Sequence, residues 1–202
     1  TGIAYGYYFR SKDISRISSV TGSAVYTFHN QFMFNVSPKI YFNTDKWYLY
    51  SNFSVRNYPD NFYGIGNKPT DIKQAFTARS VSLVAQPQYI LSKHLFVGVS
   101  FATRHEAVKT DSIFKDNIVA LSYQFGSSGW EPFSQTSVGL VAAFDSRDNQ
   151  FYPQQGFFAK TILSASKAGW GSTYSLQEVS IDCRQYIPVF GSQVLAWQAY
   201  FA

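Results

Sequence analysis

Apolar and polar residues alternate along much of this chain, and no stretch shows a convincing helical period. Within residues 31–42, every second position is apolar, while the intervening positions are mostly polar or Tyr. The first set is Phe32, Phe34, Val36, Pro38, Ile40 and Phe42, and the second is Met33, Asn35, Ser37, Lys39 and Tyr41. Successive side chains of a β-strand point to opposite faces, so this pattern predicts a strand with two unlike faces. Residues 46–58 and 94–105 repeat the pattern.

Similar signals continue to the end of the chain and predict about eleven strands. Their expected ranges are 2–10, 17–28, 31–43, 46–58, 75–91, 94–105, 117–125, 134–145, 156–166, 172–187 and 193–202. Many of these segments are about twice as long as a typical globular strand and approach the roughly 9–11 residues that cross a bilayer at a tilt. The sequence therefore predicts an all-β fold, an antiparallel transmembrane β-barrel.

Composition supports the barrel over a soluble fold. Only 14% of the 202 residues are charged, whereas 19% are aromatic. Soluble domains carry roughly a quarter charged residues. A membrane barrel turns its apolar residues outward to lipid and its small polar residues inward, so it needs fewer surface charges. A soluble sandwich of long strands remains the alternative fold.

The sequence lacks the features that mark several other classes of protein. No run of about 18 apolar residues marks a transmembrane helix, and no signal peptide is visible at the start. Cys183 is the single cysteine, so it has no disulfide partner, and the three histidines lack zinc spacing. The net charge of +5 comes without a basic run, so we expect no nucleic-acid partner. There is no G-x-S-x-G segment, and we expect neither an enzyme nor a cofactor.

A polar cluster interrupts the alternation at residues 145–156, DSRDNQFYPQQG. One reading is a metal loop, since Asp145, Asp148 and Asn149 offer oxygen ligands. Calcium loops need several more ligands at regular spacing. The stronger reading is a turn, because Asp and Asn close their own turns, Pro153 fixes φ and Gly156 adopts conformations that other residues resist. We therefore expect a hairpin joining residues 134–145 and 156–166.

The same segment resembles the D-[ST]-R-D-N-x-x-x-P-x-x-G turn of the Omp85 superfamily, the bacterial surface antigen barrels that include BamA and TamA. The matching positions are Asp145, Arg147, Asp148, Asn149, Pro153 and Gly156. NFYGIGN, residues 61–67, is similar to a segment of Bacteroidetes and patatin-linked members. Residues 172–202 look like the strand pair that follows the turn in that family.

This resemblance implies a barrel of 16 strands in the outer membrane of a Gram-negative bacterium. It implies that residues 1–202 form the first two thirds of one barrel domain, without POTRA domains and without the family's Arg-Gly-Phe loop. The expected partners are the lipid bilayer and client outer-membrane proteins or accessory subunits. The implied function is assistance with insertion, assembly or translocation of proteins. Two alternatives are a barrel that anchors or exports an attached patatin-like enzyme and a passive structural barrel or pore.

Two further groups of residues are candidates for function. The first strand is expected to form one side of a lateral seam, where an incoming strand could pair with its edge. It comprises Gly2, Ile3, Ala4, Tyr5, Gly6, Tyr7, Tyr8 and Phe9. In the second group, Glu178, Asp182 and Arg184 share one strand face and predict a lumenal ion-pair network. Their expected partners are Arg56, Arg79, Arg104 or Lys160.

The connections raise one question about strand order. His29-Asn30 and Ser92-Lys93 are both very short, yet the predicted strand count puts them on opposite rims. Short connections are expected on the periplasmic rim. Either one predicted strand between them is wrong, or both rims have short connections.

Overall fold

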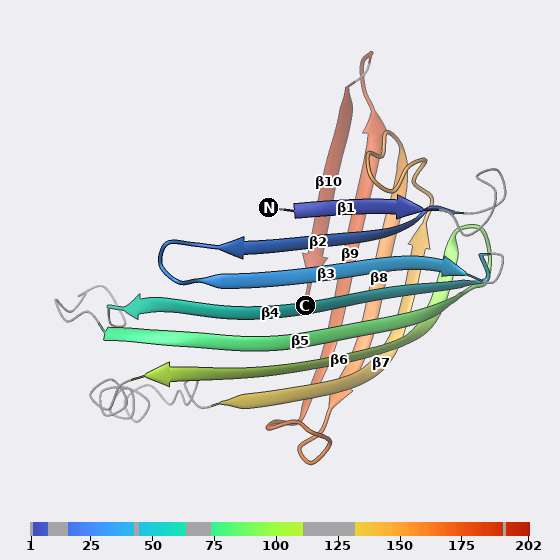
Figure 1. Ribbon diagram of the computed structural model, residues 1–202. Coiled ribbons are helices and arrows are strands. Elements are labelled where there is room, and N and C mark those ends of the chain that lie inside the picture. The colour runs from blue at the N-terminus through green and yellow to red at the C-terminus, as the bar shows by residue number, and fades with distance from the viewer. Residues whose placement is uncertain (1, 8–15, 43–44, 64–73, 111–131, 192) are drawn as a thin grey trace.

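The chain forms one antiparallel sheet of ten strands in chain order, from β1 to β10 (Figure 1). The computed structural model describes residues 2–7, 16–42, 45–63, 74–110, 132–191 and 193–202. The strands are β1 (Gly2–Tyr7), β2 (Ser18–Tyr26), β3 (Phe32–Phe42), β4 (Trp47–Phe62), β5 (Gln74–Ile90), β6 (Leu95–Thr110), β7 (Phe133–Asp145), β8 (Gly156–Ser166), β9 (Leu176–Pro188) and β10 (Val194–Phe201).

Each strand is hydrogen-bonded to its neighbours in the sequence, and the ladders are longest in the centre of the first half. The β4–β5 ladder runs from Trp47 opposite Tyr89 to Phe62 opposite Gln74. The β1–β2 ladder is much shorter and runs from Gly2 opposite Ser23 to Tyr7 opposite Ser18. The sheet curves strongly, and β1 and β10 form its two edges (Figure 1). The described strands thus form an open, partial barrel.

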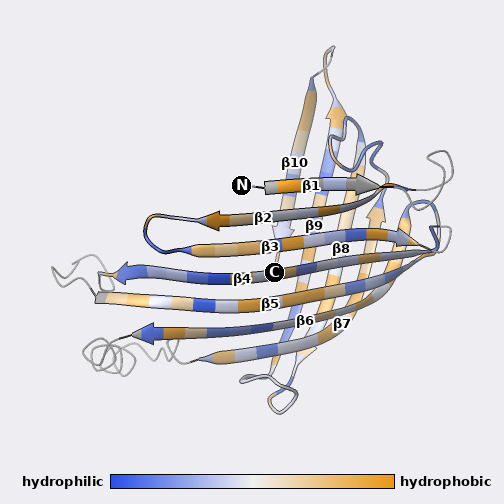
Figure 2. Cartoon of the chain, viewed as in Figure 1, coloured by the Kyte–Doolittle hydropathy of each residue, from blue (hydrophilic) through white to orange (hydrophobic). Residues whose placement is uncertain are grey.

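Hydrophobic and hydrophilic residues alternate along the strands as orange and blue bands (Figure 2). Because successive side chains of a strand point to opposite faces, this alternation divides the sheet into two unlike faces. Large apolar side chains on the convex face are exposed: Leu140 is 63% exposed and Val99 53%. On the concave face, polar side chains are buried, and Gln86 and Gln88 are only 3% and 2% exposed. This distribution is the reverse of a soluble protein and matches a barrel with lipid outside.

The predicted strands differ from the observed ones mainly at their ends. β4 and β6 extend several residues beyond the expected 46–58 and 94–105, while β9 starts later than the expected 172. The predicted strand at 117–125 lies outside the described residues. In the described sheet β6 pairs directly with β7, from Leu95 opposite Phe144 to Glu106 opposite Phe133. The described strands therefore number ten, where the sequence predicted about eleven.

The connections after β3, β5, β7 and β9 lie on one rim, called here the turn rim. Ser92-Lys93, between β5 and β6, belongs to the turn rim, whereas His29-Asn30, between β2 and β3, belongs to the opposite rim. In the second of these turns, Asn30 has a φ of 57° and its N–H donates to the Thr27 carbonyl. Both rims therefore have short connections, and the strand order between them needs no correction.

No helix in the described ranges has the length and apolar character needed to cross a membrane.

Candidate functional site

The turn between β7 and β8 starts with an ion pair between close neighbours. Arg147 Nε and Nη2 donate to the two carboxylate oxygens of Asp145, at 2.9 and 2.8 Å. Both side chains are only 12% exposed, and the guanidinium also lies over the ring of Phe158, 4.7 Å from its centroid. Burial lowers the pKa of Arg147, but the hydrogen bond and charge of Asp145 outweigh it and hold that pKa above its usual value. The pair is therefore a fixed part of the rim.

The rest of the turn is closed by side-chain oxygens that accept backbone N–H groups. Asp148 Oδ1 accepts from the N–H groups of Asn149, Gln154 and Gln155 at 2.9, 3.0 and 3.3 Å. Asn149 Oδ1 accepts from the N–H groups of the next two aromatic residues. These are the local bonds by which Asp and Asn compete with regular structure and form turns. Pro153 lies between the two sets of bonds, half-buried.

These bonds make the turn sensitive to acid. Desolvation raises the pKa of Asp148, but the three N–H donors outweigh it and hold the pKa below its usual value. A carboxylate with a depressed pKa stabilises the fold above its unfolded pKa and loses that contribution as the pH falls through the folded pKa. We expect D148N to flatten the pH dependence of stability below about pH 4. Urea midpoints of the refolded protein at pH 7 and at pH 3 measure this, and parallel curves for the two proteins would contradict it.

Gly156 ends the turn and starts β8 with a φ of +114°. A Cβ at this position would lie 2.5 Å from the carbonyl oxygen of Ser146 and 2.7 Å from the Cα of Arg147. Other residues are strained at this φ, and the two turn segments leave no room for a side chain. The glycine at the end of the motif is thus required by the geometry of the turn.

The turn also reaches across the concave face to β3. Gln150 Nε2 donates to Tyr41 Oη at 2.7 Å, although the two residues are far apart in the sequence. Tyr41 is 3% exposed and its ring lies 4.7 Å from that of Tyr48. The guanidinium carbon of Arg16 also lies over the Tyr41 ring, 5.6 Å from its centroid. We call the contact between Gln150 and Tyr41 the rim latch, because it ties the β7–β8 turn to β3.

The latch predicts coupled effects of two conservative substitutions. Y41F removes only the hydroxyl, and Q150A removes the donor, so each is expected to cost about 1 kcal/mol. The double variant should cost less than the sum, because the two side chains share one hydrogen bond. A double-mutant cycle of urea unfolding in detergent micelles measures the coupling. Strictly additive effects would show that the bond contributes nothing.

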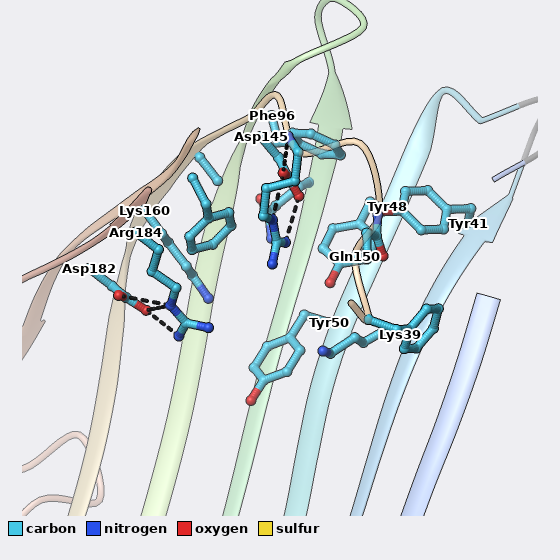
Figure 3. Close-up of a pocket in the computed structure, with 15 residues that line it drawn as sticks. Lys39, Tyr41, Tyr48, Tyr50, Phe96, Asp145, Gln150, Lys160, Asp182 and Arg184 are labelled. Carbon is cyan, nitrogen blue, oxygen red and sulfur yellow. Dashed lines mark hydrogen bonds and ion pairs between the residues drawn. The ribbon is translucent and has the colours of Figure 1, made fainter. Parts of the chain in front are cut away.

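Below the latch, side chains from seven strands and the turn surround a cavity of about 360 Å³ on the concave face (Figure 3). We call it the lumenal cavity. Its wall combines aromatic rings with charged groups from both halves of the sheet. The lining residues are Lys39, Tyr41, Tyr48, Tyr50, Gln88, Phe96, Ala143, Asp145, Arg147, Gln150, Phe151, Phe158, Lys160, Asp182 and Arg184.

Two of the three predicted lumenal charges meet at this cavity. Arg184 Nη2 lies 2.6 Å from Asp182 Oδ2, and Asp182 also accepts from Gln198 of β10. Arg184 Nε also donates to Asp182 Oδ1 at 3.1 Å, so charge-assisted hydrogen bonds hold the pair together. Glu178 lies near the start of β9, opposite Ser164, and forms no ion pair in the part of the chain that the structure describes.

The expected partners of these charges are distributed differently from the prediction. Lys160 lines the lumenal cavity and lies opposite Asp182 in the β8–β9 register. Arg104 pairs with Glu106 on its own strand. Arg79 shares the convex face with Val81, and its Nε donates to Asn57 Oδ1 at 2.9 Å. Among the described residues, no ion pair joins Asp182 or Glu178 to any of the four expected partners, Arg56, Arg79, Arg104 and Lys160.

The metal reading of the turn finds no support in the geometry. Asp145 is engaged by Arg147, and the oxygens of Asp148 and Asn149 accept backbone N–H groups. Within the described ranges, no group of three or more His, Cys, Asp or Glu side chains is placed to hold a metal ion.

The predicted seam strand is β1, an edge of the described sheet. Ile3 and Tyr5 are 75% and 67% exposed. Tyr8 and Phe9 of the same prediction lie outside the described residues.

Sequence reasoning missed most of the lumenal cavity. It assigned Lys39 and Tyr41 to an inward face but did not bring them together with Lys160. The alternation of inward and outward positions could have indicated the cavity. Tyr41, Tyr48 and Gln88 are inward positions near the turn rim on three successive strands, and they lie opposite one another in the register.

Comparison with known proteins identifies the family. A search of curated proteins found no match. Residues 17–201 match the family model described as the Omp85 superfamily domain, from just before β2 to the end of β10. The match covers nearly the whole chain and agrees with the single antiparallel sheet and its outward apolar face. The chain therefore belongs to the Omp85 superfamily, a family of outer-membrane barrels associated with protein insertion and translocation.

Proposed function

We propose that this barrel assists the insertion, assembly or translocation of other proteins at the bacterial outer membrane, without covalent chemistry or a cofactor. The observation that carries the proposal is the edge strand β1, which has β2 as its one neighbour in the described sheet. An edge strand presents unpaired N–H and C=O groups along one side. Family membership supports the same role.

The mechanism follows from backbone pairing. An extended segment of a client protein adds to the outer edge of β1 and takes up the register of an antiparallel neighbour, so that its backbone groups are satisfied before they meet lipid. Within the described sheet, β1 is paired on one side, whereas β5 is paired with β4 and β6 on its two sides. The edge is thus the place where exchange of partners costs least.

Crosslinking tests this proposal in the full-length protein in membranes. A photoreactive residue at Ile3, on β1, should form adducts with nascent outer-membrane proteins. The matched control is Val81 on β5, which is also exposed on the convex face but lies between two paired strands. Equal yields at the two positions, or none above background at Ile3, would rule out the edge as the client site.

A barrel that anchors or exports an attached enzyme is the second candidate, favoured by the NFYGIGN segment at the end of β4. Asn61, Phe62 and Tyr63 are described there, and the remaining residues of the segment are not. A hydrolase domain in the same intact polypeptide would support this candidate, and POTRA-like domains would support the first. A steady single-channel conductance of the complete barrel, without client adducts, would favour a passive pore.

A further inference from the structure

The lumenal cavity carries more positive than negative charge. Its lining contains four cations and two carboxylates. The cations are Lys39, Arg147, Lys160 and Arg184. The carboxylates, Asp145 and Asp182, are each held by the arginine two residues further along the chain. Neither lysine forms an ion pair with any described residue. The excess charge of the cavity therefore resides on Lys39 and Lys160.

The two lysines approach the cavity from opposite sides. Lys39 belongs to β3 and Lys160 to β8, and both side chains point into the space beside Tyr50 (Figure 3). Lys160 Nζ lies 2.6 Å from Gln86 Oε1 and 4.8 Å from the centroid of the Tyr50 ring. Gln86 is itself fixed by a hydrogen bond to Ser100. The direct contacts of the Lys160 ammonium are thus neutral, and Asp182, opposite Lys160 in the β8–β9 register, is already paired with Arg184.

A second, independent feature of the wall is an amide that lacks a partner. Gln88 is 2% exposed and lines the cavity, and its Oε1 has no hydrogen-bond partner in the described structure. Gly98, opposite it on β6, leaves the space for this side chain, since a Cβ there would lie 2.9 Å from Gln88 Cγ. A buried acceptor without a donor costs about 1–3 kcal/mol, so the site is suited to a group that brings a donor.

We propose that the lumenal cavity binds a phosphate group that carries a hydroxyl, either its own or that of an adjoining glycerol or sugar. A doubly charged phosphate neutralises two lysines at once, and lysine binds phosphate as a compact point charge. The hydroxyl donates to Gln88 Oε1. The cavity is large enough for such a group with a small polyol attached. Tyr48 and Tyr50 supply further hydroxyls at the wall.

The charge requirement is tested by titrating the full-length protein, in detergent micelles, with inorganic phosphate in a calorimeter. The variant K39M/K160M is expected to bind phosphate at least about tenfold more weakly. The matched control K46M/K93M removes two exposed lysines near the same rim that do not line the cavity, and it should bind as the wild type does. No saturable binding to the wild type, or equal losses in both double variants, would overturn the proposal.

The hydroxyl requirement is tested by the preference for phosphate over sulfate. At neutral pH the phosphate dianion keeps one hydroxyl and sulfate has none. The wild type should prefer phosphate by about fivefold, as expected for one hydrogen bond. The substitution Q88L should abolish that preference while sulfate binding is kept, which a folding defect would not produce. Equal affinity of the wild type for the two anions would refute the role of Gln88.

The source of the phosphate is distinguished by two probes. Soluble glycerol 3-phosphate tests a free metabolite, and nanodiscs containing phosphatidic acid, whose phosphate is a monoester, test a lipid headgroup by comparison with phosphatidylcholine nanodiscs. Binding of either probe that depends on Lys39 and Lys160 supports the proposal and names its source. If neither probe binds but inorganic phosphate does, the ligand is inorganic phosphate itself. If none of the three binds, the proposal is overturned, independently of the crosslinking result at β1.

Discussion

Replacing Gly156 with alanine is expected to prevent most of the protein from reaching its folded form. Two costs combine at this position: a φ of +114° and a Cβ only 2.5 Å from a backbone carbonyl oxygen. Strain at such a φ costs about 1–3 kcal/mol, and displacing packed backbone adds a similar amount, so the total is roughly 2–6 kcal/mol. The folded fraction after refolding, read from the mobility of unheated samples in gel electrophoresis, measures the loss.

Gly169, in the connection between β8 and β9, offers a matched control. Its φ is +95°, but a Cβ there meets no atom within 4 Å. G169A should therefore suffer the conformational cost alone, about 1–3 kcal/mol. If G156A and G169A destabilise equally, the close packing of the β7–β8 turn is not what requires a glycine.

The second large effect is expected on the convex face. Leu140 lies near the middle of β7 and is 63% exposed, with Val138 on the same face at 49%. In a barrel of this family that face meets hydrocarbon, and an arginine near the bilayer midplane costs about 2–4 kcal/mol. L140R should lower the free energy of unfolding in lipid vesicles by this amount, and much less in detergent, where water reaches the side chain easily.

The matched control places the same residue on the other face. Asn52 belongs to β4, shares the inward face with Tyr48 and Tyr50, and is half-buried. N52R adds the same charge to a polar interior and should change stability far less than L140R. The assignment of the two faces fails if N52R is the more damaging variant in vesicles.

The strands were predictable because alternation survives in every part of the chain where one face is apolar. Phe32, Phe34 and Val36 mark the convex face of β3 without ambiguity. The ends of the strands were less predictable. β4 continues through Asn57 and Asp60, where polar residues carry the ladder past the apolar band. A hydrophobic pattern ends at the lipid boundary, whereas hydrogen bonding does not.

The turn was predictable in kind, because Asp, Asn, Pro and Gly act locally. The rim latch and the lumenal cavity were not, because both depend on which strands face each other across the curved sheet. Gln150 meets Tyr41, and Lys39 approaches the same cavity as Lys160, only once the register of every intervening strand is set. Arg79 illustrates the same limit, since a one-residue change of phase moves a side chain from one face to the other.

The placement of apolar residues at alternate positions also affects how such a chain is exported to the membrane in which it folds. In the unpaired polypeptide, apolar and polar side chains alternate. No segment is therefore hydrophobic enough to stop in a membrane as a transmembrane helix while the chain crosses it. Leu140 and Val99 come together on one surface only when β6 pairs with β7, where the two residues lie opposite each other. The apolar surface that contacts lipid is thus formed only when the strands pair during folding.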